Sequence, residues 1–384
     1  MKFIAKTFHG LEPILAAELS EAGAEAVEEL TRAVSFEGDR EWIYRANLGL
    51  HTALRVLVPL HTFSCSNEKQ LYQGVREIDW QTYLSPRDTL AVEAVVHSSF
   101  FTHSHYVALK TKDAIVDQLR DHFGQRPSVD IKTPTLPVQV HIRENQCTIL
   151  LDSSGEPLFK RGYRQETGPA PLNEVLAAGM LKLAGWPRED ASFFDPMCGS
   201  GTLPIEAAMM ATRTPAQWYR THFAFQNWKD YEPELWEKVR REAGERRILT
   251  APPILGSDSH PNAIRIARIN AAQTDLHTLI EWKHEPMEEC TLPEKKGLVV
   301  FNPPYNERMP VEEIDSLYQL IGSNLKHRFA GFEAWLLSAN EKAIHAIGLR
   351  PSRKIALFNG ALPCKFLKFE LYDGSRKFKK NQEA

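Results

Sequence analysis

A loop that could bind an amino group is suggested by four consecutive residues, Asn302, Pro303, Pro304 and Tyr305. They follow an apolar run, residues 298–301, of the kind that forms a buried strand. Two consecutive prolines do not fit the interior of a strand or of a helix, because neither can donate a backbone hydrogen bond. The four residues are therefore predicted to form a stiff loop at a strand end, where polar groups are held in place.

The chemistry that suits this loop is methyl transfer to an aromatic amine. Such an amine is a poor nucleophile, because its lone pair is delocalised into the ring. Asn302 Oδ1 and the Pro303 carbonyl could accept both amine hydrogens and so expose the lone pair, while Tyr305 stacks on a base turned out of its helix. Displacement on a sulfonium methyl needs no metal. Catalysis would be mainly alignment, worth up to roughly 7–11 kcal/mol. We predict catalytic roles for Asn302, Pro303, Pro304 and Tyr305.

A second loop, residues 195–202, has the composition of a ligand-binding turn between a strand and a helix. Gly199 and Gly201 would let the backbone pass close to a ligand, and the helix beginning near Thr202 would offer free N–H groups. Asp195 and Pro196 open this loop. The carboxylate of Asp195 suits a ligand with an amine or a positive charge. The alternative is a tight turn that binds nothing.

Two further acids follow the next two predicted strands. Asp258 could hold two ribose hydroxyls, or it could cap the helix that opens at Pro261. Glu285 could accept a hydrogen bond from an adenine amino group, or it could be a surface acid. A nicotinamide cofactor fits less well, because Pro204 occupies the third glycine position of a Gly-x-Gly-x-x-Gly loop. Asp258 also lies 63 positions after Asp195 instead of about 20.

The elements that must position these loops follow from the pattern of the chain. From about residue 165, strand-like and helix-like runs alternate, which predicts a mostly parallel α/β sheet. The last run predicts an antiparallel hairpin that turns at Asn359-Gly360. The pattern of the residues before this point predicts α+β structure, with a hairpin that turns at Glu144-Asn145. We predict three domains, at residues 1–50, 51–160 and 161–384.

Composition limits the classes of protein that fit. The chain has 384 residues, of which 43% are hydrophobic and 25% charged, as in globular proteins of two or three domains. It lacks an apolar run of about 18 residues, so we expect no membrane span. Its five scattered cysteines include no Cys-x-x-Cys pair, which favours a reducing cytoplasm and argues against structural zinc. With a net charge of −3, nucleic-acid binding would need a local basic face.

The two loops at residues 195–202 and 302–305 together resemble those of class I S-adenosylmethionine-dependent amino-methyltransferases. Residues 106–120, 159–186 and 331–340 resemble the THUMP-containing 23S ribosomal RNA guanine-N2 methyltransferases, so the resemblance covers nearly the whole chain. It implies a ferredoxin-like region, a THUMP domain and a Rossmann-like catalytic domain of seven strands. It also implies N2-methylation of one guanine in large-subunit ribosomal RNA, with S-adenosylmethionine as the donor.

The resemblance also implies roles for particular residues. It assigns cofactor binding to Asp195, Pro196, Gly199, Gly201, Thr202, Asp258, Glu285 and Asn302. Glu285 stands where an Asp is usual, and Pro286 has no N–H to offer the adenine ring. Residues 162–172 are expected to fold over the cofactor. Some bacteria carry a second methyltransferase domain fused behind this one, and we expect that activity to be absent from a chain ending at Ala384.

A candidate RNA-binding face consists of basic residues, which would contact phosphates without reading sequence. Its members are Lys110, Lys112, Arg143, Lys160, Arg161 and Arg164. A single lysine could equally belong to a solvated helix face. The alternatives to a ribosomal RNA enzyme are a transfer RNA guanine-N2 methyltransferase, an adenine-N6 DNA methyltransferase and an RNA-binding module without activity. We expect a cytoplasmic monomer.

Overall fold

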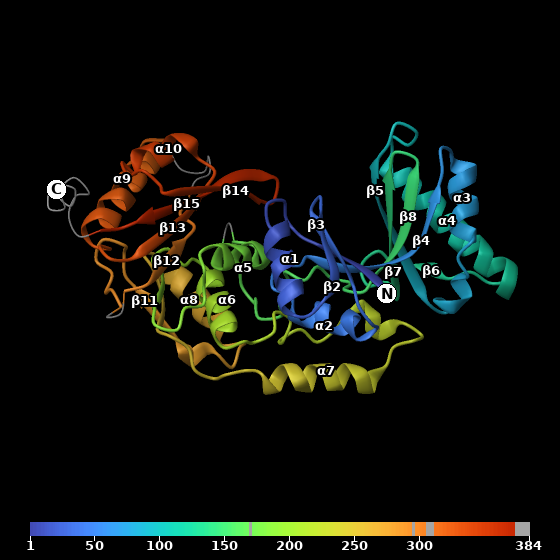
Figure 1. The fold of residues 1–384 in the computed structure, drawn as a ribbon, viewed down its shortest axis with the longest axis horizontal. Helices are drawn as coiled ribbons and strands as arrows, with labels where there is room; N and C mark the ends of the chain where they lie inside the picture. Colours follow the sequence, from blue (N-terminus) through green and yellow to red (C-terminus); the bar gives the residue numbers. More distant parts are fainter. Residues whose placement is uncertain (169–170, 294–295, 305–310, 373–384) are drawn as a thin grey trace. The chain divides into compact units, whose positions relative to one another are not determined.

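A computed structural model of the protein describes residues 1–168, 171–293, 296–304 and 311–372 (Figure 1). The chain folds into two compact units, and it passes between them more than once. The first unit contains residues 1–7, 15–158 and 221–242, and the second contains residues 8–14, 159–220 and the chain from 243 onward. Each unit is built on its own sheet.

The first unit holds a mixed sheet of eight strands. Its order is β2 (Glu25–Leu30), β3 (Ala33–Glu37), β1 (Lys2–Lys6), β4 (Arg55–Ser64), β8 (Gln146–Asp152), β7 (Leu136–Arg143), β5 (Thr89–His97) and β6 (Ser128–Val129). The helices of this part of the chain are α1 (Glu12–Glu21), α2 (Glu41–Gly49), α3 (Glu68–Arg76) and α4 (Ser104–Phe123). Strand β4 pairs with β1 on one side and with β8 on the other. A continuous sheet therefore joins the regions predicted as residues 1–50 and 51–160.

The second unit holds the α/β sheet that the alternating pattern predicts. Its order is β11 (Ile280–His284), β10 (Ile254–Asp258), β9 (Phe193–Asp195), β12 (Leu298–Phe301), β13 (Glu333–Ser338), β15 (Leu362–Glu370) and β14 (Arg353–Asn359). The first five strands are parallel, and β15 pairs antiparallel with both β13 and β14. This arrangement confirms the predicted fold class, a mostly parallel sheet of seven strands with an antiparallel hairpin.

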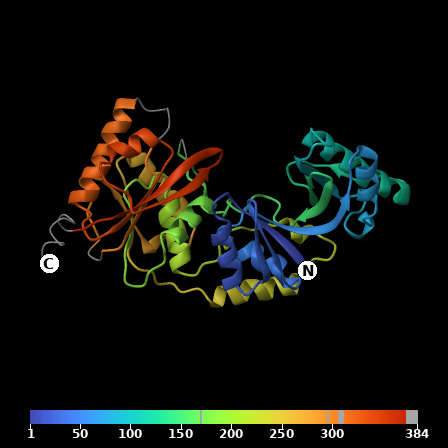
Figure 2. The ribbon, with the colours of Figure 1, turned by 45° about the horizontal axis from the view of Figure 1, so that its top comes forward.

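Helices pack on this second sheet. Figure 2 shows the sheet and its helices from a second direction. They are α5 (Glu174–Leu183), α6 (Thr202–Ala211), α8 (Pro261–Ala271), α9 (Val311–His327) and α10 (Glu341–Ala346). Helix α7 (Pro233–Glu245) lies in the insertion between α6 and β10, and most of it belongs to the first unit. None of the helices in the described ranges is long and apolar enough to cross a membrane.

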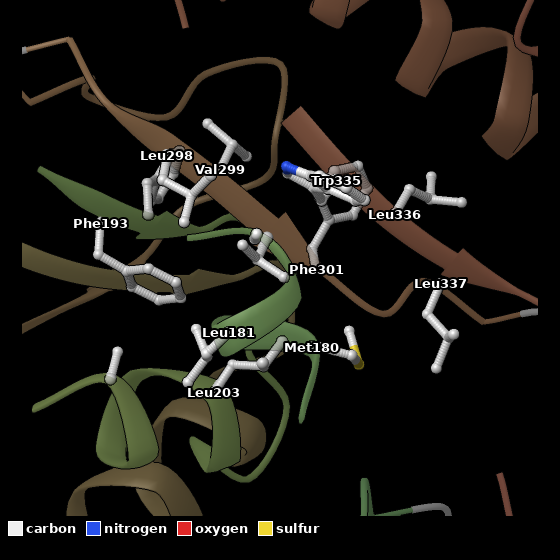
Figure 3. Packing of buried hydrophobic residues seen from close by; sticks show 14 of the residues in the cluster. Met180, Leu181, Phe193, Leu203, Leu298, Val299, Phe301, Trp335, Leu336 and Leu337 are labelled. Carbon is white, nitrogen blue, oxygen red and sulfur yellow. The ribbon is translucent and has the colours of Figure 1, made fainter. Parts of the chain in front are cut away.

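The core of the second unit is formed where α5 and α6 meet the parallel strands. Figure 3 shows Leu181 and Leu203 of these helices on the same side of the sheet as Phe193 of β9. All three side chains are almost fully buried. Burial of each such side chain is worth roughly 1.5–3 kcal/mol, so the strand ends that carry polar loops rest on a rigid support.

Two features differ from the sequence-based expectations. The C-terminal hairpin turns one residue later than predicted, at Gly360-Ala361, because Asn359 pairs with Leu362. Residue patterns do not predict β2, α3, α7 and α10. These elements are rich in charged residues, and only a few side chains in each helix are buried, for example Trp236 and Val239 in α7. The hairpin turn at Glu144-Asn145 is confirmed by the pairing of Arg143 with Gln146.

Candidate active site

The polar loops named above leave neighbouring strands at one edge of the second sheet. Strands β10, β9 and β12 are adjacent and parallel, so their carboxyl ends lie at the same edge. Asp258 and Asp195 are the last residues of β10 and β9, and Asn302 directly follows β12. Sites in open parallel sheets lie outside these carboxyl ends, where connections diverge from neighbouring strands.

The loop between β9 and α6 is a tight turn built on two glycines. Gly199 and Gly201 have φ angles of +54° and +84°, in the left-handed region that glycine adopts without strain. A Cβ on Gly201 would lie 2.8 Å from the Trp282 ring and 3.0 Å from Ala267 Cβ, so the loop packs closely on its neighbours there. Around Gly199, by contrast, no atom of the described chain beyond its sequence neighbours lies within 4 Å of an added Cβ. The backbone at Gly199 is therefore open to a ligand.

Asp258 connects two loops of this edge. Its Oδ2 accepts a hydrogen bond from the Gly199 N–H at 2.9 Å, and its Oδ1 accepts one from the His260 N–H at 2.9 Å. The second bond orders the turn that leads into α8, but it is not a helix cap, because it goes to the N–H of His260 and no described side chain caps the first turn. The first bond fixes the glycine loop, and it does not prevent the carboxylate from binding hydroxyl groups as well.

Asp195 is a buried carboxyl at the centre of the site. It is 1% exposed, and its Oδ1 accepts a hydrogen bond from the Met197 N–H at 3.0 Å. Burial raises the pKa of the carboxyl well above its usual value, the Met197 hydrogen bond lowers it, and the nearby Asp258 carboxylate raises it further. A bound cation would offset the cost of this buried negative charge.

The loop after β12 carries a polar atom without a partner. Asn302 Oδ1 is buried, and none of the described residues donates a hydrogen bond to it. Pro303 is buried and Pro304 is exposed. Tyr305, to which the sequence assigns stacking on a base, lies outside the described residues. An unpaired buried acceptor costs about 1–3 kcal/mol, so Asn302 suits a site that a donor from a ligand completes.

Two predicted RNA contacts have other partners. Arg161 is fully buried, and its guanidinium pairs with Glu206 of α6 at 3.3 Å, where the Tyr163 hydroxyl also donates a hydrogen bond. The prediction that Arg161 binds RNA is therefore corrected, because its charge is used inside the unit. The side chain of Arg164 is 16% exposed, and its guanidinium pairs with Glu174 at 2.6 Å. It too is directed to protein groups and not to a phosphate.

The other predicted basic residues have different surroundings. Lys110 lies 3.9 Å from a Glu68 carboxylate oxygen and 5.5 Å from the centre of the Tyr72 ring, and Lys112 pairs with Asp113 at 2.6 Å. Arg143 and Lys160 are exposed. The first three of these basic residues belong to the first unit, whereas Lys160 belongs to the second.

The loop after β11 is ordered by its own acid. Glu285 accepts hydrogen bonds from the Thr291 N–H at 2.7 Å and from the Thr291 hydroxyl at 3.2 Å. The carboxylate therefore closes a loop of seven residues. Its predicted contact with adenine stays a prediction.

Sequence reasoning missed Asn270, which lies on α8 and is 1% exposed. Its amide donates a hydrogen bond to the Ser200 carbonyl in the glycine loop at 3.0 Å. An asparagine in register with the buried Ile266 on the inner face of an amphipathic helix is the signal that identifies such a residue.

The residues at this edge fit an adenosyl sulfonium ligand. Asp195 supplies a buried carboxyl group, Gly199 supplies open backbone, and Asn302 Oδ1 supplies an acceptor that has no partner among the described residues. Three His, Cys, Asp or Glu side chains are nowhere grouped as metal ligands within the described ranges.

Three protein-family models match the chain. Residues 161–368 match an RMKL-like methyltransferase domain, residues 65–152 match a THUMP domain, and residues 2–57 match an RlmL ferredoxin-like domain.

Three curated relatives differ in how much of their own length this chain covers. A Synechocystis protein, slr0064, provisionally named an RNA methyltransferase, is 40% identical over 96% of this chain and 97% of its own length. Ribosomal RNA large subunit methyltransferases K/L from Methylococcus capsulatus and Syntrophotalea carbinolica are 40% and 39% identical, over 96% and 97% of this chain. The chain spans about half the length of these two relatives, 51% and 54%.

Two solved structures match nearly the whole chain. SMU.472, a methyltransferase by its title, was crystallised with SAH and is 27% identical, with a TM-score of 0.85 over 97% of this chain and 99% of that one. A Listeria monocytogenes protein whose title names a predicted N6-adenine-specific DNA methylase is 28% identical, also with a TM-score of 0.85, over 97% of this chain and 96% of its own.

Proposed function

Since the chain belongs to the RMKL-like methyltransferase family, we propose that it methylates large-subunit ribosomal RNA and takes the methyl group from S-adenosylmethionine. The acceptor atom that we propose is the exocyclic N2 of one guanine. An enzyme with this substrate would work in the cytoplasm, where ribosomes are assembled. The support comes from the named relatives for the substrate, and from the geometry of the second unit for the chemistry.

Each group at the edge of the second sheet has a role in this proposal. S-adenosylmethionine, when bound, supplies a methyl group on a positively charged sulfur. Asp195 would hold the amine or the positive charge of this donor, Gly199 and Gly201 would let it lie close to the backbone, and Asp258 would bind its ribose hydroxyls. Glu285 is proposed to bind the adenine amino group.

The observation that carries the proposal is the amide oxygen of Asn302, to which none of the described residues donates a hydrogen bond. Its buried Oδ1 follows the strand next to the one that ends in Asp195. An amino group of a base would donate one hydrogen to this oxygen and the other to the Pro303 carbonyl, which exposes the nitrogen lone pair to the methyl group. After transfer, the nitrogen releases one proton. Removal of one oriented polar group of this kind from an active site lowers kcat by about 10²–10³-fold.

RNA binding is proposed for the THUMP domain with Lys110, Lys112 and Arg143 of the first unit, and separately for Lys160 of the second unit. Arg143 and Lys160 are exposed, and Lys110 and Lys112 on α4 are partly so, whereas Arg161 and Arg164 are no longer included. Lysine and arginine contacts with phosphates supply affinity that falls steeply with salt. We therefore expect binding to structured RNA that weakens as ionic strength rises. The monomeric state and the three-domain division stay proposals.

A second candidate function, adenine-N6 methylation of DNA, is favoured by one comparison, the name of the Listeria structure. The THUMP domain argues for RNA. Transfer of tritium from labelled S-adenosylmethionine to ribosomal RNA, transfer RNA and duplex DNA separates the candidates. We expect label in ribosomal RNA, at guanine, and a preference for duplex DNA or for transfer RNA would contradict the proposed substrate.

The Asn302→Ala variant tests the catalytic assignment. We expect methyl transfer to fall at least about 10²-fold, while calorimetric affinity for S-adenosylhomocysteine stays within about threefold of the wild type. The change removes an acceptor for the target amine and leaves the loops of β9 and β10 intact. Asn262→Ala, on the exposed start of α8, serves as the control and should keep wild-type turnover. Normal turnover in Asn302→Ala would remove the assigned role.

A further inference from the structure

The guanidinium of Arg164 joins three parts of the second unit. Its Nε donates to Glu174 Oε1 at 2.6 Å, at the start of α5, and its Nη2 donates to the Leu172 carbonyl at 3.0 Å. The same group reaches the glycine loop, where Nη2 donates to Thr202 Oγ1 at 2.9 Å and Nη1 donates to Ser200 Oγ at 3.1 Å. The planar fork of arginine can make these bonds simultaneously, and a lysine cannot.

Asn270 holds the same region from the other side. Its Nδ2 donates to the Ser200 carbonyl and to the Glu166 carbonyl, both at 3.0 Å. Its Oδ1 accepts from the N–H groups of Gln165 at 2.8 Å and Glu166 at 3.1 Å. Ser200 is therefore held through its side chain by Arg164 and through its backbone by Asn270.

The glycine loop needs such restraint. Gly199 and Gly201 both have positive φ, and glycine has more accessible backbone conformations than any other residue. A loop of this kind would lose conformational entropy when a ligand orders it, unless neighbouring groups have already set its shape. Ser200 lies between the two glycines, and Thr202 begins α6. These are the two positions whose hydroxyl groups Arg164 holds, one on each side of Gly201.

We propose that Arg164 is a positioning residue for S-adenosylmethionine, which acts through Ser200 and Thr202 by holding the glycine loop in its binding conformation. The inference rests on the proposed function, since it takes this loop as the donor site. It replaces the RNA-binding role that the sequence suggests for Arg164. Arg164 has neither a phosphate nor a base as its partner in this role, and its effect on the reaction is through the affinity for the donor.

The test compares two Arg→Lys variants of the full-length chain. Arg164→Lys keeps the charge but loses the fork that reaches Ser200 and Thr202. Arg265→Lys is the matched control, because Arg265 binds Glu166 of the same segment at 2.7 Å, is 53% exposed and has no hydrogen bond to the glycine loop. Affinity and stoichiometry for S-adenosylhomocysteine are measured by calorimetry, KM and kcat by methyl transfer, and Tm by thermal unfolding.

For Arg164→Lys we expect roughly tenfold weaker binding of S-adenosylhomocysteine at unchanged stoichiometry, since charge-assisted hydrogen bonds are lost. KM for S-adenosylmethionine rises by a similar factor, while kcat and KM for RNA stay within about twofold. Arg265→Lys should change none of these values by more than about twofold. Together these results would support the positioning role.

Three results would overturn the inference. If Arg164→Lys lowers only Tm and the binding stoichiometry, with an unchanged affinity per binding site, Arg164 serves stability alone. If KM for RNA rises and donor affinity does not change, Arg164 contacts RNA. If wild type and Arg164→Lys bind S-adenosylhomocysteine equally well, the loop does not depend on Arg164. A wild-type chain that fails to bind S-adenosylhomocysteine would instead reject the proposed function itself, and the inference with it.

Discussion

The buried carboxyl of Asp195 lowers the stability of the folded protein when it is ionised, although its charge would favour ligand binding. Its carboxyl is buried, and burial raises its pKa well above the value of an exposed aspartate. The folded state therefore binds more protons at this group than the unfolded state does, from about pH 4 up to the raised pKa. Across this window, stability falls as pH rises. Such a carboxylate is retained when it serves a ligand.

The Asp195→Asn variant tests this conflict. Without cofactor, its unfolding free energy should exceed that of the wild type near pH 8, and the difference should shrink as pH falls toward 4. Affinity for S-adenosylhomocysteine should fall, because the amide has no negative charge. Urea unfolding across this pH range and calorimetry provide the two measurements, and Asp190→Asn, at an exposed position, is the surface control. A pH-independent difference between Asp195→Asn and the wild type would refute the argument.

At the scale of elements, the start of α6 depends on two glycines for different reasons. Both have positive φ, which disfavours other residues by about 1–2 kcal/mol. Only Gly201 is also enclosed, since an added Cβ would lie 2.8 Å from Trp282 and 3.0 Å from Ala267. Gly199 faces open space. The helix and its loop thus require one glycine for packing and the other for access.

The pair Gly201→Ala and Gly199→Ala separates these requirements. Gly201→Ala adds overpacking of about 1–3 kcal/mol to the backbone strain, so it should lower the unfolding free energy more than Gly199→Ala does. Gly199→Ala should cost about 1–2 kcal/mol and reduce affinity for S-adenosylhomocysteine, because the methyl group occupies open space beside the ligand. Urea unfolding and calorimetry check both effects. Equal losses of stability would contradict the packing difference.

At the scale of the molecule, part of the insertion between α6 and β10 folds as a segment of the first unit. Residues 221–242 belong there, and an aromatic cluster holds them. Trp236 of α7 lies with its ring centre 6.0 Å from that of Tyr44 and 5.3 Å from that of Phe225. The Tyr44 hydroxyl also accepts a hydrogen bond from the Glu232 N–H at 3.0 Å. The first unit is therefore incomplete without residues that follow α6 in the sequence.

Trp236→Ala should destabilise the first unit by about 3–5 kcal/mol, as expected for deletion of a buried tryptophan. Trp236→Phe should cost less, because an aromatic ring still fills part of the space. Urea unfolding of the full-length chain gives both values. If the alanine variant costs less than about 1 kcal/mol, the insertion does not stabilise this unit as argued.

Residue patterns were enough to predict the fold class of the second unit and the position of its polar loops. Glycines and prolines have local conformational limits, so Gly199, Gly201 and the prolines after Asn302 mark strand ends wherever the strands pack. The alternation of strands and helices then places these ends at one edge of a parallel sheet. Each of these predictions depends on neighbours in sequence, and none requires knowledge of contacts between distant residues.

The partners of individual charged side chains, by contrast, became evident only from the folded chain. In the sequence, Arg161 and Arg164 stand in a run of basic residues that suggests RNA binding. In the structure they pair with Glu206 and Glu174, which the neighbouring residues in the sequence do not reveal. The same holds for Asn270, whose four hydrogen bonds join segments about 70 and 105 residues away. A charge or an amide has the same identity whether water or a buried partner satisfies it, and the partner is set by long-range packing.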